Sequence, residues 1–385
     1  MSRVLSRVKP QLAATCAALL SLAVVSPPAL AQTGSWTITP SANQGNFDNK
    51  LNALSALSST AVWSVGSYNS GPYNTTPYLR TLIEFWNGSN WSIVSSPNPA
   101  TKSGDYDSLQ GVAAVSSNNV WAVGYTGNSN QLADRTLIEQ WNGTAWNVVS
   151  SPNPYLSQDL YAISVVSAND IWAVGQFQTW SQNGSLTLHW DGTRWNNVSS
   201  PASVQLYGVA AVASNDVWAV GGYEIQHWNG TSWSMIPSPQ PPYNTGYQLR
   251  AVAAVSVNNV WAVGYSYGGY YGYSYEPLIE HWDGSAWTLS PSANPTFSNT
   301  LTLSGVAALS ATDVWVVGGQ AGVSFIERWN GTQWLAVPSP NAGSVANPLL
   351  AAAALPSTGE AWAAGQSFSS STSSYRTLVE HCKTC

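Results

Sequence analysis

Residues 120–124 read Val-Trp-Ala-Val-Gly, and a Trp-Asn-Gly turn at residues 141–143 and a further tryptophan, Trp146, follow them. The same order of apolar run, turn and tryptophan returns along the chain at spacings of 43 to 58 residues. The seven apolar runs centre on Trp63, Trp121, Trp172, Trp218, Trp261, Trp315 and Trp362. Self-similarity at such a period is the signature of a repeat architecture, in which neighbouring units share a continuous core.

Each repeat is predicted to form four short strands. In the second repeat these cover residues 111–115, 120–124, 136–141 and 145–149. The Asn142-Gly143 pair between the last two is a strong hairpin signal. Four antiparallel strands per unit, repeated around an axis, are typical of a propeller blade. We therefore expect an all-β fold, a seven-bladed β-propeller of four-stranded antiparallel blades.

The two ends of the repeat region predict how the ring closes. The last repeat stops at residues 377–381, its third strand, and lacks the turn and the fourth strand. Residues 34–38, Gly-Ser-Trp-Thr-Ile, match the fourth strand of the first repeat at residues 88–93. We expect this N-terminal strand to complete blade 7, because closure removes the open sheet edges that invite aggregation.

The first residues have the pattern of an export signal. A basic start precedes an apolar run over residues 12–25, and Ala29-Leu30-Ala31 is a small-residue cleavage site. The run is too short for a permanent anchor, because a membrane-spanning helix needs about 20 apolar residues. We expect a signal peptide over residues 1–31 and a secreted, extracellular protein. Cys16 leaves a lipoprotein as the alternative.

Residues 32–385 are expected to form a single propeller domain that is a monomer without a membrane span. The full chain has 12 Lys and Arg against 18 Asp and Glu, a net charge of −6. Removal of Arg3, Arg7 and Lys9 with the leader makes the balance more acidic still. Nucleic acid is not expected as a partner, because neutralising phosphates requires clusters of Lys and Arg.

Cys382 and Cys385 are the two cysteines of the predicted mature chain. Two thiols in an exported protein favour a disulfide. The loop between them is very short, so we expect an exposed local bridge with a modest effect on stability. A redox-active Cys-x-x-Cys pair or half of a zinc site are the alternatives.

Three repeats resemble known propeller repeats. Residues 216–222, Asp-Val-Trp-Ala-Val-Gly-Gly, followed by His227 to Trp233, resemble a kelch repeat, in which an apolar strand ends in Gly-Gly before a turn and a tryptophan. Residues 313–334 match again, whereas the other five repeats keep one glycine. The turn at residues 191–195 is similar to the Asp-box hairpin of sialidase-type propellers, though shorter. The resemblance implies a propeller and leaves function open, since kelch-like proteins include enzymes and binding scaffolds.

Most residues that could carry chemistry occupy repeat positions. All tryptophans except Trp180 belong to the repeat, which indicates blade packing. The histidines share one repeat position, so they cannot converge on one site and are expected to be structural; they are His189, His227, His281 and His381. We therefore expect no cofactor and assign no catalytic residue.

Two classes of function remain. The first is a non-catalytic binding or scaffold propeller for glycans or surface proteins. The second is an extracellular carbohydrate-active enzyme, a glycoside hydrolase or lyase, which would need a convergent pair among the carboxylates outside the repeat pattern. Asp105 and Asp107 in one of these segments could hold Ca²⁺, or could belong to a solvated loop.

The variable loops predict where a ligand binds. The loops between second and third strands emerge on the same face as the connectors between blades, and length variation concentrates there. Tyrosines are abundant in the fifth repeat, and tyrosine offers a stacking surface and a hydroxyl at low entropic cost. Our ligand-binding hypothesis, for a glycan or protein, consists of Tyr243, Tyr247, Tyr270, Tyr271, Tyr273 and Trp180. The alternative is a tyrosine-rich loop packed against its own blade.

Overall fold

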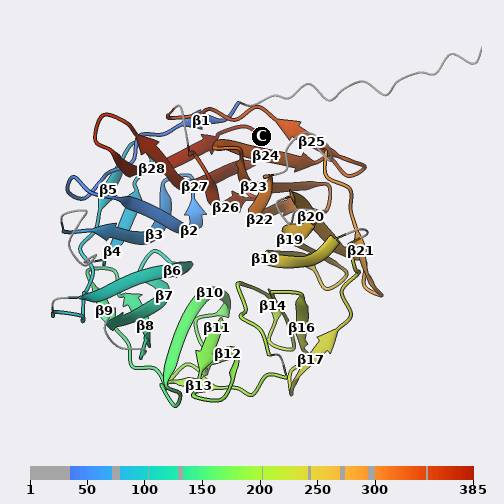
Figure 1. Ribbon diagram of the computed structural model, residues 1–385, viewed down its shortest axis with the longest axis horizontal. Coiled ribbons are helices and arrows are strands. Elements are labelled where there is room, and N and C mark those ends of the chain that lie inside the picture. Colours follow the sequence, from blue (N-terminus) through green and yellow to red (C-terminus); the bar gives the residue numbers. More distant parts are fainter. Residues whose placement is uncertain are drawn as a thin grey trace, which may run out of the picture. The chain divides into compact units, whose positions relative to one another are not determined.

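The computed structural model describes residues 35–71, 79–102, 104–128, 133–201, 203–241, 244–268, 274–293, 300–343 and 346–385, without the side chains of residues 244 and 245. Residues 33–385 form one compact unit. Its strands form seven four-stranded sheets, and Figure 1 shows these sheets as blades around a central axis. The predicted seven-bladed all-β propeller is confirmed. The described part of the chain contains no helix with the length and hydropathy needed to cross a membrane.

Each blade runs from an innermost first strand to an outermost fourth strand, and neighbouring strands are antiparallel. The first strands are β2 (Asn49–Ser58), β6 (Asp105–Ser116), β10 (Ser157–Ser167), β14 (Gly208–Ala213), β18 (Asn244–Ser256), β22 (Thr302–Ser310) and β26 (Leu349–Leu355). The second strands are β3 (Ala61–Asn69), β7 (Asn119–Asn128), β11 (Asp170–Gln178), β15 (Asp216–Gly221), β19 (Asn259–Gly268), β23 (Asp313–Gln320) and β27 (Glu360–Ser369).

The third and fourth strands form the outer half of each blade. The third strands are β4 (Leu79–Trp86), β8 (Arg135–Trp141), β12 (Asn183–Trp190), β16 (Glu224–Trp228), β20 (Ser274–Trp282), β24 (Val323–Trp329) and β28 (Ser374–Cys382). The fourth strands are β5 (Trp91–Ile93), β9 (Trp146–Val148), β13 (Trp195–Asn197), β17 (Trp233–Ile236), β21 (Trp287–Leu289), β25 (Trp334–Val337) and, in blade 7, β1 (Thr37–Ile38).

The second-strand tryptophans pack between neighbouring blades, as their repeat positions predict. Trp121 in β7 is 1% exposed, and its ring centre lies 4.9 Å from that of Trp190 and 5.7 Å from that of Trp195 in the next blade. Burying one tryptophan removes roughly 200 Å² from water. Repeated around the ring, this contact joins the blades through apolar burial.

The four histidines lie against these tryptophans. The His381 ring is stacked 3.5 Å from that of Trp362, and its Nε2 lies 3.0 Å from the Glu360 carboxylate. The other three pairs are His189 on Trp172, His227 on Trp218 and His281 on Trp261. In blade 6 the same place is taken by Arg328, whose guanidinium lies 5.1 Å from the Trp315 ring centre. A position that accepts histidine or arginine serves packing, as predicted.

The N-terminal strand closes the ring as predicted. Strand β1 pairs with β28, with Thr37 opposite His381 and Ile38 opposite Glu380. Trp36 is 5% exposed, and its ring centre lies 5.4 Å from that of Trp315 in blade 6. Blade 7 therefore combines the two ends of the propeller unit, and Figure 1 shows them side by side.

A disulfide joins Cys382 to Cys385 in the structure. The bridge is less exposed than the sequence suggests, because Cys382 occupies the position of a turn tryptophan. Cys382 is 1% exposed and packs in the cluster that contains Trp36 and Leu378, with Cys385 partly buried against it.

Thiol titration of the unreduced protein lacking residues 1–31 is expected to find no free thiol, even in denaturant that exposes Cys382. Reduction followed by the same titration should release two thiols per chain. Two reactive thiols before reduction would show that the pair is not bridged in solution.

Candidate functional site

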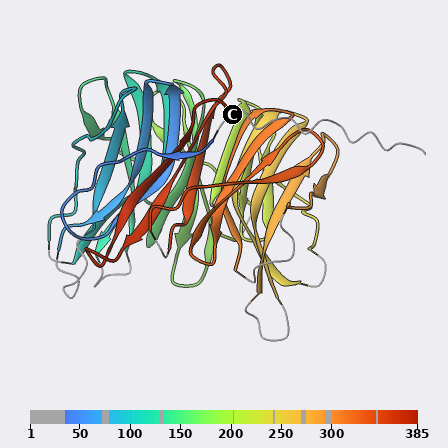
Figure 2. The same ribbon diagram turned by 90° about the horizontal axis from the view of Figure 1, so that it is seen from above.

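Variation in loop length concentrates on one face of the propeller. The turns between third and fourth strands have four residues in every blade where the two strands are consecutive. The loops between second and third strands range instead from two residues after β15 to nine after β3. Figure 2 shows the strands running between the two faces. We call the face with the second-to-third loops and the blade connectors the loop face.

The first strands place one side chain from each blade on the propeller axis. In six blades a β-bulge interrupts the pairing of the first and second strands, and the extra residue of the bulge faces the axis. In blade 4 the equivalent residue directly precedes β14. We call these seven residues the axial ring: Asn52, Gln110, Tyr161, Tyr207, Arg250, Ser304 and Leu350.

The residues around each bulge explain its position. Every axial-ring residue follows a fully buried leucine and precedes alanine or glycine, as in Leu109-Gln110-Gly111. A Cβ added to Gly111 would lie 3.1 Å from the Cα of Ala162 in the next blade, so only small residues fit where the first strands converge. Steric crowding also explains the glycine at the end of the Val-Trp-Ala-Val-Gly run. A Cβ on Gly124 would lie 1.9 Å from the Ser108 carbonyl oxygen.

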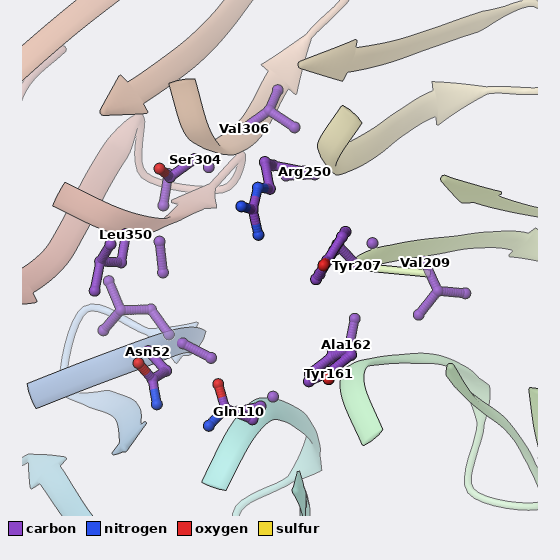
Figure 3. A pocket seen from close by; sticks show the side chains of 18 of the residues that line it. Asn52, Gln110, Tyr161, Ala162, Tyr207, Val209, Arg250, Ser304, Val306 and Leu350 are labelled. Carbon is purple, nitrogen blue, oxygen red and sulfur yellow. The ribbon is translucent and has the colours of Figure 1, made fainter. Parts of the chain in front are cut away.

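The axial ring surrounds a pocket that opens on the loop face. Its mouth has a volume of about 590 Å³ and is lined by ring residues together with Lys50, Thr302, Tyr265 and Tyr275. These four residues lie at the ends of strands that begin or finish at the loop face. A narrower space of about 190 Å³ continues along the axis between the ring residues and the small residues that follow them. Figure 3 shows the ring side chains converging on this space.

Aromatic contacts hold Arg250 in the pocket. The Tyr161 and Tyr207 rings are stacked with their centres 5.3 Å apart. The Arg250 guanidinium lies 4.4 Å from the Tyr207 ring centre and donates a hydrogen bond of 3.2 Å to the Tyr265 hydroxyl. Cation–π contacts of this kind orient a guanidinium without neutralising its charge. The side chains of blades 3, 4 and 5 therefore fix a cation at the axis (Figure 3).

Lys50 is a second cation at the mouth. It lies on β2, two residues before the axial-ring residue of blade 1. Burial lowers the pKa of Lys50, and the charge of Arg250 lowers this pKa further. Within the described ranges neither cation forms an ion pair with a carboxylate, and the residues that line the pocket there include no Asp or Glu.

Exposed aromatic side chains gather on the loop face of blades 3 to 5. Trp180 is 87% exposed in the loop after β11, and Tyr223 is 57% exposed in the turn after β15. Tyr267 and Tyr275 are 40% and 37% exposed near the long loop of blade 5. The other large hydrophobic side chains that the described ranges expose are aliphatic.

The predicted ligand-binding residues are placed differently from one another. Trp180 is exposed on the loop face, and its role as a contact residue stays a prediction. Tyr247 is 7% exposed, and its hydroxyl donates a hydrogen bond of 3.1 Å to the Tyr223 carbonyl oxygen. The remaining four lie outside the described residues, and the tyrosine platform stays a prediction; they are Tyr243, Tyr270, Tyr271 and Tyr273.

The acidic residues of blades 2 and 3 are engaged in local hydrogen bonds. Asp105 accepts from the Lys102 backbone amide and from Asn128, whereas Asp107 lies 3.3 Å from the Arg80 guanidinium. Further along, Asp134 accepts from the Tyr106 hydroxyl and Asp159 from the Tyr161 hydroxyl at 3.1 Å. No group of three or more His, Cys, Asp or Glu in the described ranges is arranged to hold a metal ion.

The axial ring was not predicted from the sequence, although a signal for it exists. A leucine, any residue, then alanine or glycine stands at the start of every repeat. The middle residue varies among the blades, whereas the leucine before it and the small residue after it recur. Such a contrast within one chain distinguishes the residues that pack the blades from the residue that faces the axis.

The comparisons with known proteins find neither a matching family model nor a matching curated protein. Among solved structures, YCF48 bound to a D1 peptide is 15% identical, with a TM-score of 0.57 over 94% of this chain and 99% of that chain. YCF48 from Cyanidioschyzon merolae is 12% identical, with a TM-score of 0.54 over 90% of this chain and 98% of that chain.

A third similar structure is the extracellular domain of a putative hybrid two-component system from B. thetaiotaomicron. It is 10% identical, with a TM-score of 0.56 over 90% of this chain and 39% of that chain. At these identities the likeness shows the propeller fold alone. The kelch-like and Asp-box assignment therefore stays a prediction, and the chain is a Trp-rich seven-bladed propeller.

Proposed function

We propose that the chain is a secreted, non-catalytic binding propeller that holds a glycan or protein ligand over the loop face, at the mouth of the axial pocket. The observation that carries the proposal is the axial ring. The frame around it repeats in all seven blades, whereas the ring itself presents amide, phenol, guanidinium, hydroxyl and aliphatic groups. Residues that vary on a rigid repeated scaffold are typical of binding surfaces.

The aromatic side chains of the loop face support this placement. Trp180, Tyr223 and Tyr275 lie on three consecutive blades, and Tyr275 also lines the mouth of the pocket. Aromatic residues with a polar end are enriched where proteins contact ligands, because they bury a large area and still offer a hydrogen bond. In the proposal, Tyr270, Tyr271 and Tyr273 extend this surface.

The similar structures support a binding role outside the cytoplasm. One YCF48 structure holds a peptide, and the B. thetaiotaomicron structure is an extracellular domain. The expected signal peptide over residues 1–31 agrees with that location. The carbohydrate-active enzyme finds no support at Asp105 and Asp107, whose carboxylates bind the Lys102 amide, Asn128 and Arg80. Asp134 and Asp159 interact through their side chains, and this pair keeps the enzyme as the alternative.

Ligand arrays with loop variants test the proposal. The secreted protein is applied to a glycan array and to a peptide array, and its best ligand is then measured in solution. We expect the triple change Tyr270→Ala, Tyr271→Ala, Tyr273→Ala and the single change Trp180→Ala to weaken binding by about tenfold or more, as loss of aromatic anchors does. The melting temperature should stay unchanged.

Leu289→Ala is the matched control, because Leu289 is 39% exposed in the same blade but on its outermost strand, β21. Unaltered binding by both loop variants would show that the ligand does not lie on the loop face. A loss of binding that only follows a loss of stability would identify the tyrosines as packing residues.

A further inference from the structure

The axial pocket concentrates positive charge in an acidic protein. The chain has 18 acidic against 12 basic residues. The described lining of the pocket nevertheless contains Lys50 and Arg250 and no Asp or Glu. Arg250 comes from blade 5 and Lys50 from blade 1, and each charge affects the same space near the axis. Neither is paired with a carboxylate within the described ranges, so their charge is directed at whatever occupies the pocket.

The Tyr207 ring inside the pocket does not offer a free face for stacking. Tyr207 lies between Tyr161 of the preceding blade and Arg250 of the following blade. Its ring centre is 5.3 Å from the Tyr161 ring centre and 4.4 Å from the Arg250 guanidinium. The Arg250 side chain also contacts the Tyr265 ring, at 5.6 Å. A sugar ring would need a free aromatic face, whereas a small anion needs only the two cations.

We propose that the axial pocket binds the C-terminal carboxylate of a protein segment that enters from the loop face. The inference rests on the proposed binding function and names the group that the pocket recognises. A guanidinium and an ammonium donate charge-assisted hydrogen bonds to a carboxylate, which are about twice as strong as neutral ones. The planar guanidinium of Arg250 matches both carboxylate oxygens, and Lys50 adds a point charge.

The shape of the pocket favours a chain end over a glycan. The mouth of about 590 Å³ adjoins a smaller axial space of about 190 Å³, which suits a group that enters end-on. A peptide has its carboxylate at its last residue, on a thin extended chain that fits such an opening. A uronic acid places its carboxylate beside a pyranose ring, which is wider than an extended peptide chain. The preceding residues of the segment would contact the aromatic side chains of the loop face.

Paired peptide pools test the carboxylate. A degenerate octapeptide pool with free C-termini and the same pool with C-terminal amides are incubated with the secreted protein, and the retained peptides are quantified by mass spectrometry. An oligosaccharide that ends in glucuronic acid serves as the third probe. We expect retention of the free-acid pool at least about tenfold above the amidated pool, because a lost charged hydrogen bond weakens binding by that order.

Charge variants assign the effect to the pocket. Arg250→Gln and Lys50→Gln should each reduce retention of the free-acid pool about tenfold or more, at an unchanged melting temperature. Arg194→Gln is the control, because the Arg194 side chain is 78% exposed on the β12–β13 turn of the opposite face. Its retention should equal that of the unmodified protein.

Equal retention of the two peptide pools would overturn the inference, and so would retention that survives both charge variants. Preference for the glucuronic acid probe would also overturn it, since the carrier would then be a glycan. These results leave the proposed binding function intact as long as an array ligand still depends on the loop-face residues. Failure of the arrays together with the pools would remove both.

Discussion

Deletion of residues 32–40 is expected to lower the melting temperature by about 10 °C or more and to promote aggregation. The deletion removes Trp36, which is 5% exposed against blade 6, and strand β1, which is the outermost strand of blade 7. Loss of a buried tryptophan costs about 3–5 kcal/mol, and 1 kcal/mol shifts the melting temperature of a large domain by roughly 2–4 °C. Loss of β1 also exposes the edge of β28, which can pair with another chain.

Two point variants separate packing from strand pairing. Trp36→Ala should reproduce most of the loss of stability, whereas Ile38→Ala should have a small effect because Ile38 is 37% exposed. Scanning calorimetry and light scattering measure the two consequences. A melting temperature that is unchanged by the deletion would contradict the role of β1 in closing the ring.

The stability of the protein is expected to fall as the pH rises from 6.5 to 8.5. The third strands carry buried glutamates that face neighbouring blades, and burial raises the pKa of Glu84, Glu139 and Glu280 to about 8 and that of Glu380 to about 7. These carboxyls are protonated in the folded state but ionise near 4.5 when unfolded. Their stabilising contribution is therefore complete below pH 4.5 and is lost as the pH rises through 8.

The histidines define the lower limit of this window. Burial lowers the pKa of His281 and His381 below 6.5, so both oppose folding only at more acidic pH. Above pH 6.5 the glutamates dominate the dependence. Melting temperatures measured across this range should decrease steadily, and a flat or rising profile would contradict the protonated state of these side chains.

One blade already carries the neutral equivalent of these glutamates. Gln226 in β16 occupies the position of Glu280 in β20 and accepts a hydrogen bond of 2.7 Å from Ser200, as Glu280 does at 3.0 Å from Ser238. Glu280→Gln is therefore expected to raise the melting temperature at pH 8.5 by several degrees, since one unit of pKa shift corresponds to about 1.4 kcal/mol. The gain should shrink at pH 6.5.

Glu276→Gln is the matched control for this substitution, because Glu276 is exposed on the same strand. It should leave the pH profile unchanged. Equal destabilisation by Glu280→Gln at both pH values would contradict the prediction. It would show that the Glu280 carboxyl is ionised in the folded state.

The candidate site was predicted in part. The loop face follows from strand count and loop length, and Trp180 stands out because it departs from the repeat; both inferences use the sequence directly. Lys50 and Arg250 were not singled out from the sequence, because neither departs from the repeat in the way that Trp180 does. A β-bulge shifts the alternation of inward and outward residues by one, so a period of two does not show which side chain faces the axis.

The sequence by itself determined the number of blades, their four strands and the closure by the N-terminal strand. These features depend on local patterns of tryptophan, glycine and turn residues. Because the patterns recur along the chain, they can be recognised from the sequence alone. Only the tertiary structure decided which side chains meet at the axis. Lys50, Tyr207 and Arg250 come from different blades, and they share one pocket because the ring closes and the small residues beside each bulge let the first strands converge.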